Sequence, residues 1–221
     1  MRGCVLSACI ALVLTPSSRA VAQPTQDHPA DHVLQAPGQL GGHQLALKPF
    51  STLPNGVLFL RLENFLTITA AQQAATPASA VVKWAGKVWL FTLGSAGQRS
   101  RGGTFVAEIG PIPDVPTAAR YVLDVNEAEF GPDLKAQVAR QVHTHPGPEI
   151  FYLLTGEQCL ETPTGATRAR AGQGMVAPAD TPMQLNIMGG SKRDAFFVVV
   201  HDSTKPRVTP SDWQPKGTCE Q

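Results

Sequence analysis

Short apolar runs alternate along this chain with stretches rich in glycine and proline, and long runs of helical periodicity are few. Residues 150–154 and 195–200 are nearly continuous apolar runs of β-branched and aromatic residues, which is typical of buried strands. Nineteen prolines and twenty glycines supply turns between such runs. Further strand-like runs lie at residues 57–69, 81–93, 104–109, 118–125, 166–170 and 183–188. The pattern predicts an all-β protein of many short strands.

The N-terminal half contains a glycine-rich loop at residues 94–103, between two strand-like runs. We expect residues 81–93 and 104–109 to pair as a hairpin with this long loop. Trp84 and Trp89 lie in the first run, and we expect both to be packing residues, because large aromatic side chains usually serve burial.

The segment before His143 fits two structures. Residues 134–141 contain good helix formers and could make two helical turns. A helix continuing through this point would send His143 and His145 to opposite sides. Alternation instead places Gln141, His143 and His145 on one face of a strand, which is the interpretation we favour. Gln141 would then be a donor to one of the histidines.

A candidate metal site follows from this strand. Two residues apart on a strand, His143 and His145 project to the same face. Pro146-Gly147-Pro148 cannot continue a ladder, so we expect a short hairpin that brings Glu149 back beside both imidazoles. Two imidazoles and a carboxylate suit iron, manganese or zinc. A hydrogen-bonded trio without metal is the alternative reading of the same residues.

The spacing from His143 to Gly156, HxHxxxE and then glycine after six residues, resembles the first motif of the cupin superfamily. This resemblance covers residues 117–203 and implies a cupin-type double-stranded β-barrel, or jelly roll, that holds the metal inside. It also implies that Gln158 points inward, where it could orient a ligand, and it makes a homodimer a reasonable expectation.

The second cupin motif is only partly present, at residues 172–183. Asp180 stands where the family pattern has its second glycine, and Met183 stands where it has a histidine. A thioether suits copper(I) and is a poor ligand for iron or manganese, so the fourth protein ligand of the family is missing. Gln184 and His201 are the candidates to replace it.

Composition places the chain among ordinary globular proteins, with 43% hydrophobic residues, 16% charged residues and a net charge of +1. This balance argues against nucleic acid or an anionic membrane as a partner.

Residues 1–22 read as a secretory signal peptide, so we expect a periplasmic or secreted protein with no membrane segment after cleavage. The absence of an HxH pattern from the N-terminal half favours added strands over a degenerate second copy of the barrel. The expected division is signal peptide 1–22, mobile leader 23–42, N-terminal strands packing on the barrel 43–116, cupin barrel 117–203 and C-terminal tail 204–221.

Cleavage of the signal peptide would leave two of the four cysteines, Cys159 and Cys219. In an oxidising compartment such a pair is a disulfide candidate. Two unpaired thiols are the alternative, because the sequence does not show that the residues come within reach of each other.

Two classes of function remain. The protein could bind a small molecule in its barrel, with a divalent metal on the partial His/His/Glu site, and this is the reading we favour. It could instead be a metal-dependent enzyme of the dioxygenase, isomerase or hydrolase type, since the fold alone does not dictate function.

Overall fold

The computed structural model describes residues 41–113, 115–131 and 142–220. The predicted signal peptide, residues 23–40 of the predicted leader, and the segment of mixed helix and strand character, residues 134–141, therefore lie outside the described residues. Within the described ranges, strands dominate, accompanied by the short α-helix α1 (Ile68–Ala74) and the 3-10 helix η2 (Thr218–Glu220). The predicted all-β class is confirmed. No helix in these ranges is long and apolar enough to span a membrane.

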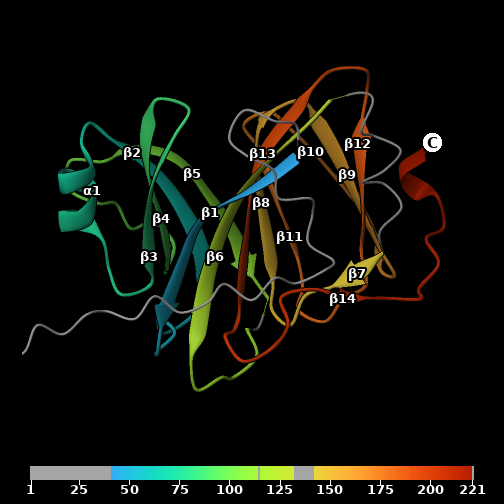
Figure 1. The fold of residues 1–221 in the computed structure, drawn as a ribbon, viewed down its shortest axis with the longest axis horizontal. Coiled ribbons are helices and arrows are strands. Elements are labelled where there is room, and N and C mark those ends of the chain that lie inside the picture. The colour runs from blue at the N-terminus through green and yellow to red at the C-terminus, as the bar shows by residue number, and fades with distance from the viewer. Residues whose placement is uncertain (1–40, 114, 132–141, 221) are drawn as a thin grey trace, which may run out of the picture.

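The central sheet has five antiparallel strands in the order β1-β6-β13-β8-β11, and Figure 1 shows it in the middle of the molecule. Its strands are rich in the β-branched and aromatic residues that fit a pleated, buried surface. They are β1 (Gly41–Phe50), β6 (Tyr121–Phe130), β8 (Glu149–Thr155), β11 (Gly174–Ala177) and β13 (Arg193–Asp202).

A second sheet faces the central one and has the order β10-β9-β12. It consists of β9 (Glu157–Thr162), β10 (Gly165–Arg170) and β12 (Gln184–Met188). The short strand β7 (His143–Thr144) joins its edge through a bridge in which the backbones of His143 and Met183 exchange hydrogen bonds of 3.2 and 2.9 Å.

Strands β6 to β13 therefore form two layers, β6-β13-β8-β11 and β7-β12-β9-β10. This is the strand order of an eight-stranded jelly roll, the architecture that cupins use. The predicted jelly roll is thus confirmed by its own topology. One core lies between the two layers and contains Ala128, Phe130, Phe151, Leu153, Leu160, Ala169, Met175, Ala177, Met183, Leu185, Ile187, Ala195 and Phe197.

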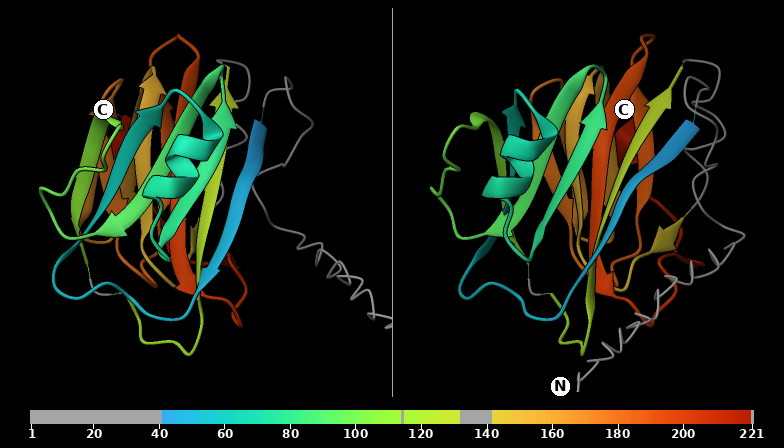
Figure 2. Two further views of the ribbon diagram at one scale, coloured as in Figure 1. Left: turned by 90° about the vertical axis from the view of Figure 1, so that its left-hand side faces the viewer. Right: turned by 60° about the vertical axis from the view of Figure 1, so that its left-hand side comes forward.

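The N-terminal strands form a third layer. They pair antiparallel in the order β3-β4-β2-β5 and cover the other face of the central sheet, as Figures 1 and 2 show. Phe196 of β13 packs against this layer, with its ring edge-on to Trp89 at 4.9 Å and to Phe91 at 5.1 Å. The strands are β2 (Leu58–Phe65), β3 (Ser79–Trp84), β4 (Lys87–Gly94) and β5 (Thr104–Ile112).

The expected hairpin across residues 94–103 is wrong. Strand β4 pairs with β3 and β2, and β5 pairs with the opposite edge of β2, so that β2 lies between β4 and β5. The glycine-rich loop crosses the end of β2, where the Ser100 amide donates a 2.8 Å hydrogen bond to Glu63. A flexible loop of this length can span one strand as readily as it can close a hairpin.

The C-terminal segment packs along the second sheet. Its strand β14 (Thr209–Pro210) pairs with β7. A disulfide then joins Cys219 to Cys159 of β9, with 5.7 Å between their Cα atoms, as the cysteine content suggested. Figure 1 shows this segment passing β7 at the base of the molecule and ending beside β9 and β12.

Candidate metal centre

The three predicted ligands come from two facing sheets. His143 lies on β7 in one layer, and Glu149 begins β8 in the other. Strands β7 and β8 do not pair with each other, so the expected hairpin is wrong, although the expected convergence of the side chains is found. Pro146-Gly147-Pro148 is instead the crossover from one sheet to the other. The two prolines end the strand in either case, so they do not distinguish a hairpin from a crossover.

Gly147 is required in this crossover by the close approach of β13. A Cβ atom there would overlap the Val200 carbonyl oxygen and would lie 2.8 Å from the Val200 carbonyl carbon. The Val200 amide also donates a 3.2 Å hydrogen bond to the Pro148 carbonyl. The crossover is thus packed against the central sheet, which sets the position of Glu149.

His143, His145 and Glu149 bring one potential ligand atom each to within 4.8 Å of the others. All three side chains are buried, with exposed fractions of 6%, 0% and 1%. The two imidazole rings are nearly perpendicular, at 85°, with centroids 4.9 Å apart. The structure therefore brings the predicted residues together inside the jelly roll.

The orientation of His145 fixes its tautomer. Its Nδ1 atom lies 2.6 Å from the backbone carbonyl oxygen of Arg207, which can only accept, so Nδ1 carries the proton and donates it. The Nε2 atom of a neutral ring then presents a lone pair. It makes no hydrogen bond in the described structure and lies 3.4 Å from Glu149 Oε2. The unprotonated Nε2 of His145 and the carboxylate oxygen of Glu149 thus lie close together, and a cation bound between them would stabilise this arrangement.

The degenerate second motif retains the backbone geometry of a tight turn. Asp180 adopts φ +53°, a left-handed conformation that aspartate tolerates better than most residues, and its amide donates a 2.8 Å hydrogen bond to the His145 carbonyl. Met183 is opposite His143 in the bridge, so both side chains point to the same face. The Met183 side chain is fully buried in the core between the layers, where an apolar group packs beside the candidate centre.

The predicted glutamines do not join the three ligands. Gln158 is fully buried and points inward as expected, but its amide oxygen accepts a 2.7 Å hydrogen bond from Arg193 Nε, and its nitrogen donates to Met175 Sδ at 3.4 Å. Gln184 pairs with Glu161 and alternates with the inward-facing Leu185, so it lies on the outer face of β12. Gln141 is outside the described residues.

His201 is the next-to-last residue of β13 and does not belong to the group of ligand atoms within 4.8 Å. Burial lowers the pKa of His201, and the nearby charge of Arg207 acts in the same direction, against the opposite effect of the hydrogen bond to the Asp202 backbone and of the Asp124 charge. Its Nδ1 donates to the Asp202 carbonyl at 2.8 Å. His201 is therefore held as a neutral ring.

Sequence reasoning missed a polar group beside the centre. Arg207 Nη1 lies 3.2 Å from Asp124 Oδ2 and also donates a 3.2 Å hydrogen bond to Asn126 Oδ1. Asn126 and Gln44 each donate a 3.0 Å hydrogen bond to Asp124 Oδ1. Alternate polar residues in the apolar strand β6 were an available signal for Asp124 and Asn126. For Arg207, no periodic pattern in the sequence indicated a position beside the centre.

A second group of acidic residues lies at the far end of the central sheet, where Glu127, Glu129 and Asp194 bring carboxylate oxygens within 4.8 Å of one another. His43 Nδ1 is 2.9 Å from Glu127, and Lys192 pairs with Glu129. Burial raises the pKa of Glu127 to about 8, the adjacent Asp194 acts in the same direction, and His43 opposes them. The carboxyl group of Glu127 is therefore held in its protonated form at neutral pH.

This shift predicts a pH-dependent stability. Between its ordinary pKa of 4.5 and about 8, Glu127 keeps its proton when folded and loses it when unfolded. The unfolded state then binds fewer protons, so stability falls as the pH rises through this window. Glu127→Gln should flatten that dependence and raise the free energy of unfolding at the upper end by about 2 kcal/mol.

Urea unfolding across that pH range measures the effect, with the more exposed Glu129→Gln as the control. An unchanged pH dependence in Glu127→Gln would show that Glu127 does not hold this proton.

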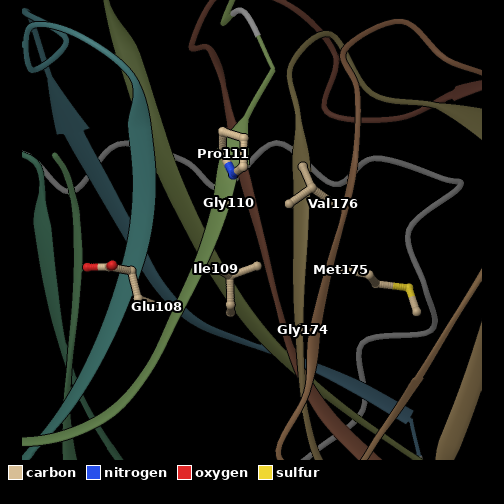
Figure 3. A pocket seen from close by; sticks show the side chains of 7 residues that line it. All are labelled: Glu108, Ile109, Gly110, Pro111, Gly174, Met175 and Val176. Atoms are coloured by element: carbon tan, nitrogen blue, oxygen red, sulfur yellow. The ribbon is translucent and has the colours of Figure 1, made fainter. Parts of the chain in front are cut away.

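An open surface hollow lies elsewhere, at the seam between β5 and β11, with a volume of about 320 Å³. Ile109 and Val176 face each other across the seam in Figure 3, whereas Glu108 and Met175 point away from it. The Glu108 carboxylate accepts a 3.0 Å hydrogen bond from the Gly97 amide. This hollow is separate from the candidate metal centre. Its lining consists of Glu108, Ile109, Gly110, Pro111, Gly174, Met175 and Val176.

No protein-family model matches the sequence, and no curated protein matches it. Among solved structures, matches include cupin and double-stranded β-helix proteins. An acireductone dioxygenase from Bacillus anthracis, with a cadmium ion in its active centre, aligns at 11% identity and a TM-score of 0.32, over 39% of this chain and 54% of its own.

Two other matches are of the same quality. A cupin-like protein from Thermotoga maritima aligns at 15% identity and a TM-score of 0.34, over 44% of this chain and 68% of its own. A double-stranded β-helix protein from Klebsiella pneumoniae aligns at 14% identity and a TM-score of 0.31, over 48% of this chain and 84% of its own. The fold assignment rests on the order of the strands, because these alignments are partial and distant.

Proposed function

We propose that the protein is an exported jelly-roll protein that binds a divalent metal on His143, His145 and Glu149. A small molecule would bind at the coordination positions that these three residues leave open. The observation that carries the proposal is the convergence of three buried side chains, since His143, His145 and Glu149 bring potential ligand atoms to within 4.8 Å of one another. Export is supported by the Cys159–Cys219 disulfide, since disulfides persist in oxidising compartments.

The donor set fits iron, manganese or zinc. Neutral imidazole nitrogens and carboxylate oxygens are ligands for all three ions. Met183, which stands where the family pattern has its fourth ligand, supplies an apolar side chain instead. When bound, such an ion would act as a Lewis acid toward an oxygen atom of the small molecule. The protein residues would hold the ion, fix the rings and exclude water.

A catalytic role is the second candidate. It is favoured by the number of protein ligands, because three ligands and an open position are typical of catalytic rather than structural metal sites. Oxygen consumption and product formation with candidate substrates would separate turnover from binding.

Metal content tests the proposal. The chain without residues 1–22 should bind one zinc or manganese ion per molecule, and His143→Ala, His145→Ala and Glu149→Gln should each weaken binding by about 100-fold or more, since each removes one of three ligands. Equilibrium dialysis followed by elemental analysis measures both the stoichiometry and the affinity.

His43→Ala is the matched control, because His43 is also a buried imidazole beside a carboxylate, in the other acidic group. It should bind metal as the unmodified chain does. Equal trace metal in all variants would contradict the proposal, and loss of metal in His43→Ala alone would place the ion elsewhere.

A further inference from the structure

The C-terminal segment, residues 203–219, forms part of the wall around the candidate metal centre. Its strand β14 pairs with β7, with Pro210 opposite His143, and the Ser211 amide donates a 3.0 Å hydrogen bond to the Val142 carbonyl. On its other edge β7 is bridged to Met183. The strand that carries His143 is thus held between the second cupin-like motif and the C-terminal segment.

Arg207 anchors this segment in the central sheet. Its side chain is only 8% exposed, and its guanidinium group pairs with Asp124 at 3.2 Å and lies 5.6 Å from the ring centroid of Phe197. Asp124 is itself oriented by hydrogen bonds from Asn126 and Gln44. A buried arginine with a paired carboxylate has one well-defined position, so the backbone of residue 207 is fixed as well.

The backbone of the same residue contacts a candidate ligand. The Arg207 carbonyl accepts a hydrogen bond from His145 Nδ1 at 2.6 Å, which leaves an unprotonated Nε2 with its lone pair on the side of Glu149. Metal-binding histidines commonly donate their other nitrogen to a carbonyl or carboxylate, which fixes the ring and its tautomer.

The far end of the segment is tied to β9. Glu161 accepts hydrogen bonds from the Lys216 amide at 2.6 Å and from the Thr218 hydroxyl at 3.2 Å, and the disulfide joins Cys219 to Cys159. Both cysteines are fully buried. The bond is therefore a permanent tether of this segment, because labile disulfides are usually exposed.

We propose that Arg207 is a positioning residue of the metal centre: its ion pair with Asp124 holds its backbone carbonyl against His145 and so presents Nε2 of His145 to the metal. This inference rests on the proposed function for the metal, but the arrangement of His145 exists in the metal-free chain. It can therefore be tested without metal.

Nitrogen-15 NMR of the imidazole rings in the metal-free protein reports the tautomer of each histidine. His145 should carry its proton on Nδ1 in the unmodified chain, and Arg207→Ala should shift it toward a mixture of both tautomers. Arg207→Lys, which keeps a cation near Asp124, should preserve most of the Nδ1 form. Lys205→Ala is the matched control, since Lys205 is in the same segment and exposed, and it should change nothing.

Cobalt(II) titration gives the second readout. Arg207→Ala should bind cobalt about 10- to 100-fold more weakly than the Lys205→Ala control, with altered visible absorption bands, as expected when an outer contact of a metal ligand is lost. An unchanged tautomer in Arg207→Ala would overturn the inference. Absence of cobalt binding by the unmodified chain, with the tautomer shift present, would contradict only the proposed metal function.

Discussion

Replacing Gly147 by alanine should lower the free energy of unfolding by about 3 kcal/mol or more. The added Cβ atom would overlap the Val200 carbonyl oxygen and would lie 3.0 Å from the Cα atom of His201. Both are backbone atoms of β13, so relief requires movement of the crossover or of the central strand. Because Gly147 lies between His145 and Glu149, the same movement should separate the ligand atoms and weaken metal binding.

Urea unfolding measures the stability of this variant against Gly190→Ala. A Cβ atom at Gly190 meets nothing within 4 Å, and that glycine has no left-handed backbone conformation. The Gly190 variant should unfold at the same urea concentration as the unmodified chain. If the two alanine variants unfold at the same midpoint, the crossover is not packed against β13 as described.

Removal of the disulfide has the second large expected effect. The double variant Cys159→Ala/Cys219→Ala opens a loop closed over a sequence separation of 60 residues. In the chain-entropy model, such a loop contributes about 4 kcal/mol by restricting the unfolded chain. The C-terminal segment should loosen first, because its end is held to β9 by this bond and by Glu161.

Guanidinium unfolding without reductant compares the double variant with the unmodified chain. The difference should disappear when the unmodified chain is unfolded in the presence of a dithiol, while the variant should be insensitive to it. Identical midpoints without reductant would mean that Cys159 and Cys219 are not bonded in the folded protein.

The candidate centre could be predicted from sequence because its signal is local. His143, His145 and Glu149 fall within a few residues of each other, and the period of a strand is enough to put both rings on one face. Gly156, at the end of the same motif, has a local cause in its φ of +73°, and a second cause outside the motif, because a Cβ atom there would lie 2.8 Å from the Cα atom of Arg193.

Contacts between distant segments could not be predicted in this way. The Arg207 carbonyl is 62 positions from His145 along the chain, and the Arg207 side chain is 81 positions from Asn126. The sequence near residue 207 shows no periodic pattern, so it predicted only a C-terminal tail for this segment. Its role depends on the order of the strands, which brings β14 beside β7.

Both hairpin errors have a related origin. A short connection such as Pro146-Gly147-Pro148 is compatible with a hairpin and with a crossover between sheets. The loop at residues 94–103 is long enough for β5 to pair either with β4 or with the far edge of β2. Local composition identifies a turn, but the partner of each strand depends on which apolar faces are buried together. In this fold the layers are buried against each other through contacts such as that between Trp89 of β4 and Phe196 of β13.

Anomalous X-ray scattering from crystals of the protein loaded with zinc locates the metal directly. We expect one zinc peak inside the jelly roll, bound by nitrogen atoms of His143 and His145 and an oxygen atom of Glu149 at about 2.0–2.2 Å. A peak at Glu127, Glu129 and Asp194 instead, or the absence of any peak near His145, would contradict this expectation.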